Sequence, residues 1–371
     1  MVIVYLDSQD FSHFSTKHKD YEKYSSLKSQ LLQLKKTGKV RFVFSDVHIY
    51  EVYPKDGKAT AEGLERIRTI AEFCGRDSLP SFSTLLEHEA TENLCKMRGN
   101  QSPPSPISTN WFPDLGIRNQ PLSRPERGNR VERRVLERTL RRTKSRETAT
   151  AEFRQMYPFL KRSEVFIKYY GHQAEWEDVV RMIEDSLQDI ESLSSFLISN
   201  SDHGLDIPNI LRGGYESYIN AISLLRDEVA LLARRASTVD QKCELAVAID
   251  HELDKAVEEA RASIIPKIMA SPGNNGSIRD GVKKINGTMP CFDALIRYLA
   301  ELIRRSSQIS TPRKPLGSDF GDALHVAYFP RVGVFRTDAT AADVLKRLYP
   351  DRKADIISDV FKLPDRIIWE L

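Results

Sequence analysis

The chain has 371 residues, of which 40% are hydrophobic and 29% charged, and its 55 basic and 52 acidic residues give a net charge of only +3. This composition is typical of a folded globular protein and excludes a chain that is disordered throughout. The hydrophobic runs are too short and too interrupted by charge for a membrane helix, which needs about 20 apolar residues.

Two further features bear on the compartment. The four cysteines lie far apart, without the spacing of zinc ligands, so we expect reduced thiols. Met1 leads directly into VIVYLD, without the basic segment or cleavage site of a secretory signal. The sequence therefore favours a cytoplasmic protein with no membrane partner.

The first 75 residues alternate between predicted strands and helices. VIVYL at 2–6 and VRFVF at 40–44 are apolar enough to be strands buried on both faces. Between them, the leucines of 25–39 recur at helical spacing, and Gly38 provides a stop. Ser45 is placed to cap a helix that follows the second strand. This alternation predicts an α/β fold with a mostly parallel sheet.

From about residue 60 the pattern becomes helical for more than half of the chain. Loops rich in proline, serine or glycine, at 101–108 and 271–277, interrupt it. Hydrophobic residues recur at helical spacing in 61–74, 131–142, 175–198, 215–236, 239–264 and 290–305. We interpret residues 76–307 as a large all-α insertion.

The α/β character returns at the end of the chain. The predicted elements are a helix over 318–329 capped by Ser318, a strand over 332–336, a helix over 339–349 and a last strand over 365–371. The two α/β ends predict one discontinuous domain, formed by 1–75 and 308–371 and interrupted by the helical insertion.

Three carboxylates stand close to the ends of predicted strands. Asp7 directly follows the first strand, Glu51 lies on the helix after the second, and Asp338 comes two residues after the strand at 332–336. In an open α/β sheet, ligands bind where the loops at the carboxyl ends of the strands converge. We therefore expect these three side chains to meet at one edge of the sheet.

A fourth contribution comes from the helix over 318–329. Asp319 and Asp322 are three residues apart and share a helix face, with His325 one turn further along. So many carboxylates would repel one another without a bound cation. Mg²⁺ or Mn²⁺ suits oxygen ligands of this kind, so the sequence predicts a divalent metal site.

Four motifs in this order resemble those of PIN-like domain nucleases. They are VIVYLDS with Asp7 and Ser8, FSDVHIYE with Ser45 and Glu51, FGDALHVAYF with Asp322, and VFRTD with Thr337 and Asp338. The resemblance covers 1–75 and 308–371. It implies a PIN-like mostly parallel sheet flanked by helices, and a metal-dependent endonuclease that hydrolyses phosphodiester bonds, RNA being favoured over DNA. It also implies that two copies can pair as a homodimer.

The resemblance assigns roles to individual residues. Asp7, Glu51, Asp322 and Asp338 would be catalytic and hold the metal, which lowers the pKa of the attacking water. Asp319 would complete a second metal position or orient a water. Ser8 and Thr337 would hydrogen-bond the metal-binding carboxylates. His325 stands where many relatives have an apolar residue, so it is a ligand, a substrate contact or a partner of Asp319.

Each carboxylate also has a plain structural interpretation. Asp7 is placed as a turn residue at a strand end, and Glu51 could face solvent. Asp319 and Asp338 stand at helix starts, where a carboxylate caps the helix or interacts with its dipole. Asp322 is harder to explain in this way, because it begins the apolar stretch ALHVAYF.

Segment 118–146 is a basic arm with eleven Arg or Lys against three Glu. Its predicted helix projects basic residues from one side, namely Arg134, Arg138, Arg141 and Arg142. An arginine-rich surface is suited to nucleic-acid phosphates, so we predict nucleic-acid binding here. A solvated helix with internal ion pairs, or an acidic protein partner, stays open.

Three functions compete. The first is an endoribonuclease whose insertion selects the substrate or a partner. The second is an inactive PIN-like scaffold that acts as a nucleic-acid or protein interaction module. The third is a phosphatase of the haloacid-dehalogenase type, which usually has Asp two residues after its nucleophile, whereas this chain has Gln9.

Overall fold

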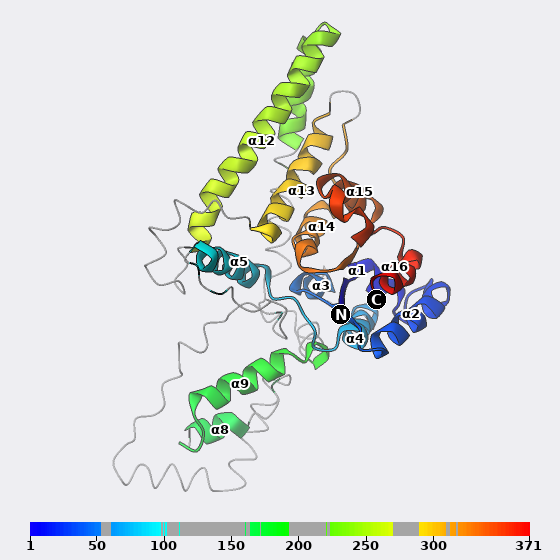
Figure 1. Cartoon of the computed structure of the whole chain (residues 1–371), viewed down its shortest axis with the longest axis vertical. Coiled ribbons are helices and arrows are strands. Elements are labelled where there is room, and N and C mark those ends of the chain that lie inside the picture. Colours follow the sequence, from blue (N-terminus) through cyan, green and yellow to red (C-terminus); the bar gives the residue numbers. More distant parts are fainter. Residues whose placement is uncertain are drawn as a thin grey trace.

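The computed structural model is shown in Figure 1. The residues that it describes are 1–52, 61–97, 99, 101, 111, 160, 164–170, 172–192, 220, 223–269, 289–308, 312–316 and 318–371. The basic arm at 118–146, with Arg134, Arg138, Arg141 and Arg142, lies outside the described residues, as does the helix predicted over 131–142.

A four-stranded sheet unites the two ends of the chain. Its strands are β1 (Val2–Tyr5), β2 (Val40–Val43), β3 (Val334–Arg336) and β4 (Ile356–Ile357), in the order β2-β1-β3-β4. All neighbouring strands are parallel, and Val4 of β1 is aligned with Phe42 on one side and Val334 on the other. The predicted α/β fold with a parallel sheet is confirmed.

Among the described residues, two helices lie between β1 and β2, and three more follow β2. They are α1 (Ser8–His13), α2 (Tyr21–Lys36), α3 (Asp46–Val52), α4 (Ala61–Cys74) and α5 (Phe82–Met97). α4 has the bounds that the sequence predicts. α2 begins four residues before the predicted start, where Tyr24 packs against the core and extends the apolar face by one turn. The sequence pattern did not single out α5.

The C-terminal part contains α13 (Pro290–Ser306), α14 (Asp319–Val326) and α15 (Ala339–Leu348). α13 and α15 match the predicted helices to within one residue, whereas α14 ends three residues before the predicted end. The last strand predicted at 365–371 is wrong, because this segment belongs to helix α16 (Leu363–Glu370). Leu363 and Ile367 are buried one turn apart, and a proline occupies the first helical turn, where it is tolerated. Short 3₁₀ helices complete this part, η5 (Phe329–Arg331), η6 (Pro350–Asp355) and η7 (Val360–Lys362).

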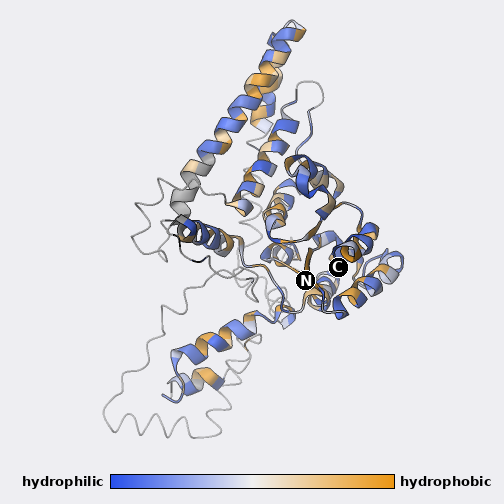
Figure 2. Cartoon of the chain, in the orientation of Figure 1, coloured by the Kyte–Doolittle hydropathy of each residue, from blue (hydrophilic) through white to orange (hydrophobic). Residues whose placement is uncertain are grey.

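The sheet is covered on both faces. Successive residues of a strand point to opposite faces, and Val4 and Tyr5 accordingly belong to two separate hydrophobic clusters. One cluster includes residues of α1, α2, α4 and α16, and the other includes residues of α13, α14 and α15. In Figure 2 the helices around the sheet mix the colours of hydrophobic and hydrophilic residues, as expected for helices with one buried face. The sheet is thus the middle layer of a three-layer structure.

Glu89 of α5 ties together helices that are far apart in the sequence. Its buried carboxylate accepts hydrogen bonds from the backbone N–H of Cys291 at 3.0 and 3.1 Å and from Arg331 at 2.7 Å. The first two bonds satisfy an N–H at the start of α13, which has no partner within the helix. α5 and α13 therefore pack against the α/β part and help to bury its core.

The rest of the described middle is helical. It includes α8 (Glu164–Tyr170), α9 (Trp176–Leu187), a helical stretch over 223–235 and α12 (Val239–Met269). α12 extends away from the sheet, and Arg304 of α13 pairs with its Asp250 and Asp254 at 2.8 and 3.0 Å (Figure 1). Among the described residues, none of the helices combines the length and the apolar character that spanning a bilayer requires.

Candidate functional site

The structure brings the four principal carboxylates to the carboxyl edge of the sheet. Asp7 follows β1, Asp338 follows β3, Glu51 lies on α3 after β2, and Asp322 lies on α14. β1 and β3 are adjacent and parallel, so the residues that follow them leave the sheet at the same edge. The side chains come from both ends of the sequence and belong to one region.

Asp322 shows how closely the four carboxylates interact. Burial raises its pKa, and the negative charges of Asp338, Asp7 and Glu51 raise it further, whereas His325 lowers it. The net result is a pKa of about 7, compared with an ordinary value of 3.8. A nearby carboxylate anion disfavours ionisation of a second carboxyl group, and Asp322 is the group that shows this effect here. A cation bound near Asp322 would relieve this repulsion.

Glu51 is paired with His325. Nε2 of His325 lies 3.3 Å from Oε2 of Glu51 and 3.3 Å from the hydroxyl of Ser8. Burial alone would raise the pKa of Glu51, but His325 and Ser8 lower it to about 2. For His325, burial alone would lower the pKa, but Glu51, Asp7 and Asp322 produce a net rise. Glu51 is therefore a carboxylate anion, with 32% of its side chain exposed to solvent.

Gly321 allows Glu51 to approach α14. A β-carbon at position 321 would lie 2.9 Å from Oε1 of Glu51, which is closer than such contacts occur. The contact would be with the mobile end of a side chain, so a larger residue would displace the carboxylate and leave the backbone in place. The glycine before Asp322 therefore has a local reason in the packing of α3 against α14.

A buried hydrogen-bond network holds His325. Its Nδ1 lies 2.7 Å from the hydroxyl of Tyr5, and the same hydroxyl lies 2.7 Å from Oγ of Ser45. With Nε2–H donated to Glu51, Nδ1 accepts from Tyr5 when the ring is neutral and donates to it when the ring is charged. The raised pKa of His325 favours the charged form. The network fixes the ring and thereby the carboxylate that it contacts.

His48 closes the network at its inner end. Its Nδ1 accepts from the backbone N–H of Ser45 at 3.0 Å, and its Nε2 donates to the carbonyl of Leu6 at 2.9 Å. Because one nitrogen faces a donor and the other an acceptor, the ring is neutral. Burial and His325, whose ring centroid is 4.7 Å away, lower the pKa of His48 to about 3. Ser45 thus bonds to side chains of this network, which differs from the capping role predicted for its hydroxyl.

Asp7 and Asp338 also cap helices, as their plain structural interpretation predicts. Oδ1 of Asp7 accepts from the N–H of Gln9 at 2.8 Å, and Oδ1 of Asp338 accepts from the N–H of Ala341 at 2.6 Å. A carboxylate has about four lone-pair positions, so a cap bond leaves room for a second ligand. Capping holds each carboxylate in a fixed position at the sheet edge.

Asp319 is held by contacts with the loop that precedes its helix. Its two oxygens accept from Arg313, each at 2.6 Å, and Oδ2 also accepts from the N–H of Leu316 at 2.9 Å. Both oxygens of this buried carboxylate are thus engaged by groups of the protein, which speaks against its predicted place among the metal ligands. Ser318 makes no capping hydrogen bond, because its backbone is already helical, with φ −77° and ψ −20°.

Thr337 is buried, and its backbone N–H bonds to the carbonyl of Ile357. Among the described residues, its hydroxyl makes no hydrogen bond to a carboxylate, so the predicted supporting role has no contact behind it. The preceding residue, Arg336, pairs with the buried Asp10 at 3.0 Å. Asp10 in turn accepts from the N–H of Asp7 at 3.1 Å, which links the end of β3 to the start of α1.

Three residues of this region were missed by reasoning from the sequence, namely Tyr5, His48 and Tyr298. A tyrosine in a buried strand requires a partner for its hydroxyl, and this rule could have indicated Tyr5. Tyr298 reaches the region from α13, and burial together with Asp322, Asp338 and Asp319 raises its pKa. No local pattern marks Tyr298 or His48, because their contacts depend on the fold.

The site suits a hard cation in its chemistry. Its donors are carboxylate oxygens, which Mg²⁺ and Mn²⁺ prefer, and the field at Asp322 favours positive charge. In the described part of the chain, however, no group of three or more His, Cys, Asp or Glu side chains is already gathered closely enough to hold a metal ion. Binding therefore requires small side-chain movements, which the partly exposed Glu51 can make.

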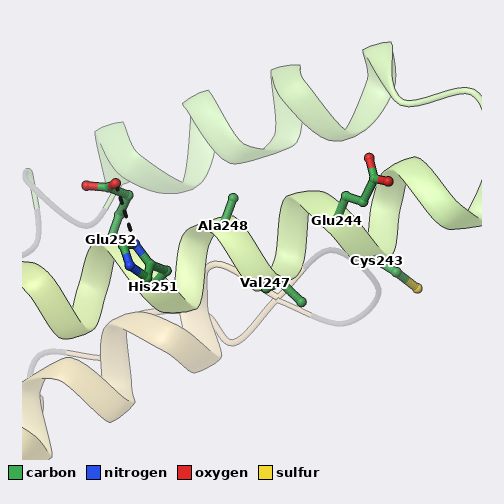
Figure 3. A pocket seen from close by; sticks show the side chains of 6 residues that line it. All are labelled: Cys243, Glu244, Val247, Ala248, His251 and Glu252. Carbon is green, nitrogen blue, oxygen red and sulfur yellow. Dashed lines mark ion pairs between the residues drawn. The ribbon is translucent and has the colours of Figure 1, made fainter.

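A hollow also lies on α12, which contributes none of the carboxylates described above. The described residues that line it all belong to this helix, namely Cys243, Glu244, Val247, Ala248, His251 and Glu252 (Figure 3). His251 and Glu252 form an ion pair at 3.8 Å. The hollow shares no residue with the carboxylate edge, so it forms no part of the candidate site.

The fold and the edge of carboxylates define an α/β protein with an acidic, oxygen-rich site. Comparisons with protein-family models, with curated proteins and with solved structures find no match to this chain. Any function must therefore be argued from the residues themselves.

Proposed function

We propose that the chain is a divalent-metal-dependent nuclease of the PIN-like kind that hydrolyses phosphodiester bonds in RNA. The observation that carries the proposal is the convergence of Asp7, Glu51, Asp322 and Asp338 at the carboxyl edge of a parallel sheet. The mutual repulsion reported by the pKa of Asp322 supports it, because such a group of anions favours a cation.

Each residue has a definite part in this proposal. Asp7, Glu51, Asp322 and Asp338 hold Mg²⁺ or Mn²⁺, and the metal supplies Lewis-acid activation of the phosphate and of a water molecule. Asp7 and Asp338 are held by the helices that they cap. Glu51 is oriented by His325, which Tyr5 holds in turn. Asp319 maintains the loop before α14 through Arg313.

The choice of RNA over DNA, the pairing of two copies and the selection of substrate by residues 76–307 belong to the same proposal. Their support is the sequence resemblance and the arginine excess of segment 118–146. The described helices of this stretch contribute a long exposed helix, α12, that could meet a protein partner.

A second candidate is an inactive scaffold that uses the same fold for interaction. It is favoured by one observation, the absence of an already gathered metal cluster among the described residues. Calorimetric titration of the full chain with Mn²⁺ separates the two. Heat of binding that disappears in Asp322→Asn supports the nuclease, whereas the scaffold predicts no heat in either protein.

The direct test is cleavage of RNA, single-stranded DNA and duplex DNA by the full chain. We expect cutting of RNA with Mg²⁺ or Mn²⁺, and none with EDTA. Asp7→Asn and Asp322→Asn should abolish it, whereas Asp351→Asn, at an exposed position in η6, should not. Cutting that persists in both site variants would contradict the proposal.

A further inference from the structure

Arg66 of α4 is an arginine on the inward face of its helix. It lies three residues after Gly63 and four before Ile70, both of which are buried, and one residue before the buried Ile67. Arg66 itself is half-buried, and its Nε is shielded from solvent. Arg68, only two residues further, lies on the outer face with 59% of its side chain exposed.

Among the described residues, Arg66 has no hydrogen-bond or ion-pair partner. Its buried Nε makes no hydrogen bond, and no ion pair joins its guanidinium to any of the described residues. Other arginines with a shielded Nε differ, because Arg331 and Arg336 form ion pairs with Glu89 and Asp10 through their terminal nitrogens. A guanidinium that is partly removed from water without a partner costs free energy. This cost would be offset by an anion that binds there.

The surroundings of Arg66 point to the carboxylate edge. α4 packs against α1 and α3, the helices whose residues include or adjoin Asp7 and Glu51. Thr16, shortly after α1, donates a hydrogen bond to Glu65 of α4 at 2.8 Å. Burial lowers the pKa of Arg66, whereas the negative charges of Glu51 and Glu62 raise it, so Arg66 lies within the electrostatic reach of the site.

The charges of the site explain why an anion would be held between the metal and Arg66. Four carboxylates exceed the charge of one divalent ion and one imidazolium, so a phosphodiester would still meet a negative site. Glu51 is already paired with His325, which leaves Arg66 free to donate to a different group. The fork of a guanidinium suits two oxygens of one phosphate.

We propose that Arg66 binds a backbone phosphate of the nucleic acid that occupies the carboxylate edge. This inference rests on the proposed nuclease function and adds to it a residue that contacts substrate. It gives the site a positive contact in the described part of the chain, on the side of α4, in addition to any contribution from segment 118–146.

The test measures binding of a labelled single-stranded RNA to the full chain over a range of salt concentrations, with Ca²⁺ present and gels confirming that the probe stays intact. Arg66→Ala should bind about tenfold more weakly, since a charged hydrogen-bonded contact is lost. The slope of log K against log salt should become shallower by about 0.7, the value of one phosphate contact on a single strand. Arg66→Lys should keep the slope and recover only part of the affinity.

Arg68→Ala is the matched control. It removes the same charge from the same helix, but Arg68 is paired with Glu65 and Glu191 on the outer face, so we expect wild-type affinity and slope. Thermal melts of the free proteins check folding. Removal of an unpartnered, half-buried guanidinium should leave the melting temperature of Arg66→Ala at or above that of the wild type.

The outcomes separate this inference from the proposed function. Equal affinity and slope for wild type and Arg66→Ala, or an equal loss in Arg68→Ala, overturns the role of Arg66, whether or not the chain cuts RNA. Binding that depends on Arg66 in a chain that never cuts RNA overturns the nuclease proposal and supports the phosphate contact. Wild-type KM for RNA cleavage in Arg66→Ala overturns the contact and leaves the nuclease standing.

Discussion

Replacement of Asp322 by asparagine should make the metal-free protein more stable at alkaline pH. The folded state raises the pKa of Asp322 from 3.8 to about 7, because the carboxylate is buried beside Asp338, Asp7 and Glu51. A carboxyl group with a raised pKa contributes stability only while it is protonated, and this contribution is lost as the pH rises through about 7. Asparagine keeps the shape of the side chain and removes the charge.

The size of the effect follows from the two pKa values. The difference between 3.8 and about 7 corresponds to an upper limit of roughly 4 kcal/mol at pH 8. At pH 5 most of this penalty is absent, because Asp322 is still protonated in the folded protein. Between pH 5 and pH 8, the wild type should therefore lose about 2 to 3 kcal/mol more than Asp322→Asn.

Urea denaturation of both proteins in EDTA at the two pH values measures this difference. Addition of Mg²⁺ at pH 8 should raise the free energy of unfolding of the wild type, because the ion offsets the repulsion between the carboxylates. At ten times its dissociation constant, a ligand that binds only the folded state stabilises by about 1.4 kcal/mol, which should appear in the wild type and not in the variant. Asp351→Asn controls for the general effect of removing a negative charge. A variant that is less stable than the wild type at pH 8 in EDTA would refute the argument from repulsion.

Three further predictions concern the neighbours of these carboxylates. Gly321→Ala should keep or slightly raise stability, because alanine favours a helix by about 0.5 to 1 kcal/mol. It should lower kcat/KM for RNA about tenfold or more, because Oε1 of Glu51 must move away from the new β-carbon. Unchanged kinetics would show that this contact is unimportant. Tyr5→Phe should lower the free energy of unfolding, measured in urea, by about 1 to 3 kcal/mol, since Ser45 and His325 each lose a buried partner. Tyr349→Phe serves as the control, and a similar loss there would mean that the hydroxyl of Tyr5 has no special role. His48 is held neutral with a pKa of about 3 against an ordinary 6.5, so the unfolded chain takes up its proton first as the pH falls. The free energy of unfolding therefore drops between pH 6.5 and pH 3, by up to about 5 kcal/mol. His48→Gln should flatten this pH profile, and a profile as steep as that of the wild type would contradict the assignment.

The sequence predicted the positions of the principal carboxylates because each follows a local rule. Asp7 and Asp338 each come two residues after the end of a buried strand, and parallel strands bring their carboxyl ends to one edge. Glu51 and Asp322 lie on helices whose apolar spacing was visible. The α/β fold with a parallel sheet followed from the same alternation of strand and helix patterns.

Other features depend on contacts that local patterns do not show. β4 has only two residues, too few to display any alternation, and α16 was mistaken for a strand because its short apolar run DRIIWEL fits either structure. Asp319 was expected to bind metal, but its partner Arg313 lies in an irregular loop whose path cannot be predicted from composition. Arg66 and Tyr298 come to the site only through the packing of α4 and α13.

The distance along the chain between the halves of the site bears on what the intervening residues can do. Tyr5 and His325 are 320 residues apart, and β2 and β3 lie on either side of β1. The entropy of closing a loop grows only with the logarithm of its length, so a connection about ten times longer than an ordinary strand-helix-strand crossover costs at most about 2 kcal/mol more. Contacts such as the one from Glu89 to the start of α13 recover part of this cost, because they fix the ends of the connection against the sheet. Residues far from these ends can therefore change with little effect on the geometry of the carboxylates. If the proposed function holds, residues of the connection that select substrate could change without altering the carboxylates that carry out cleavage.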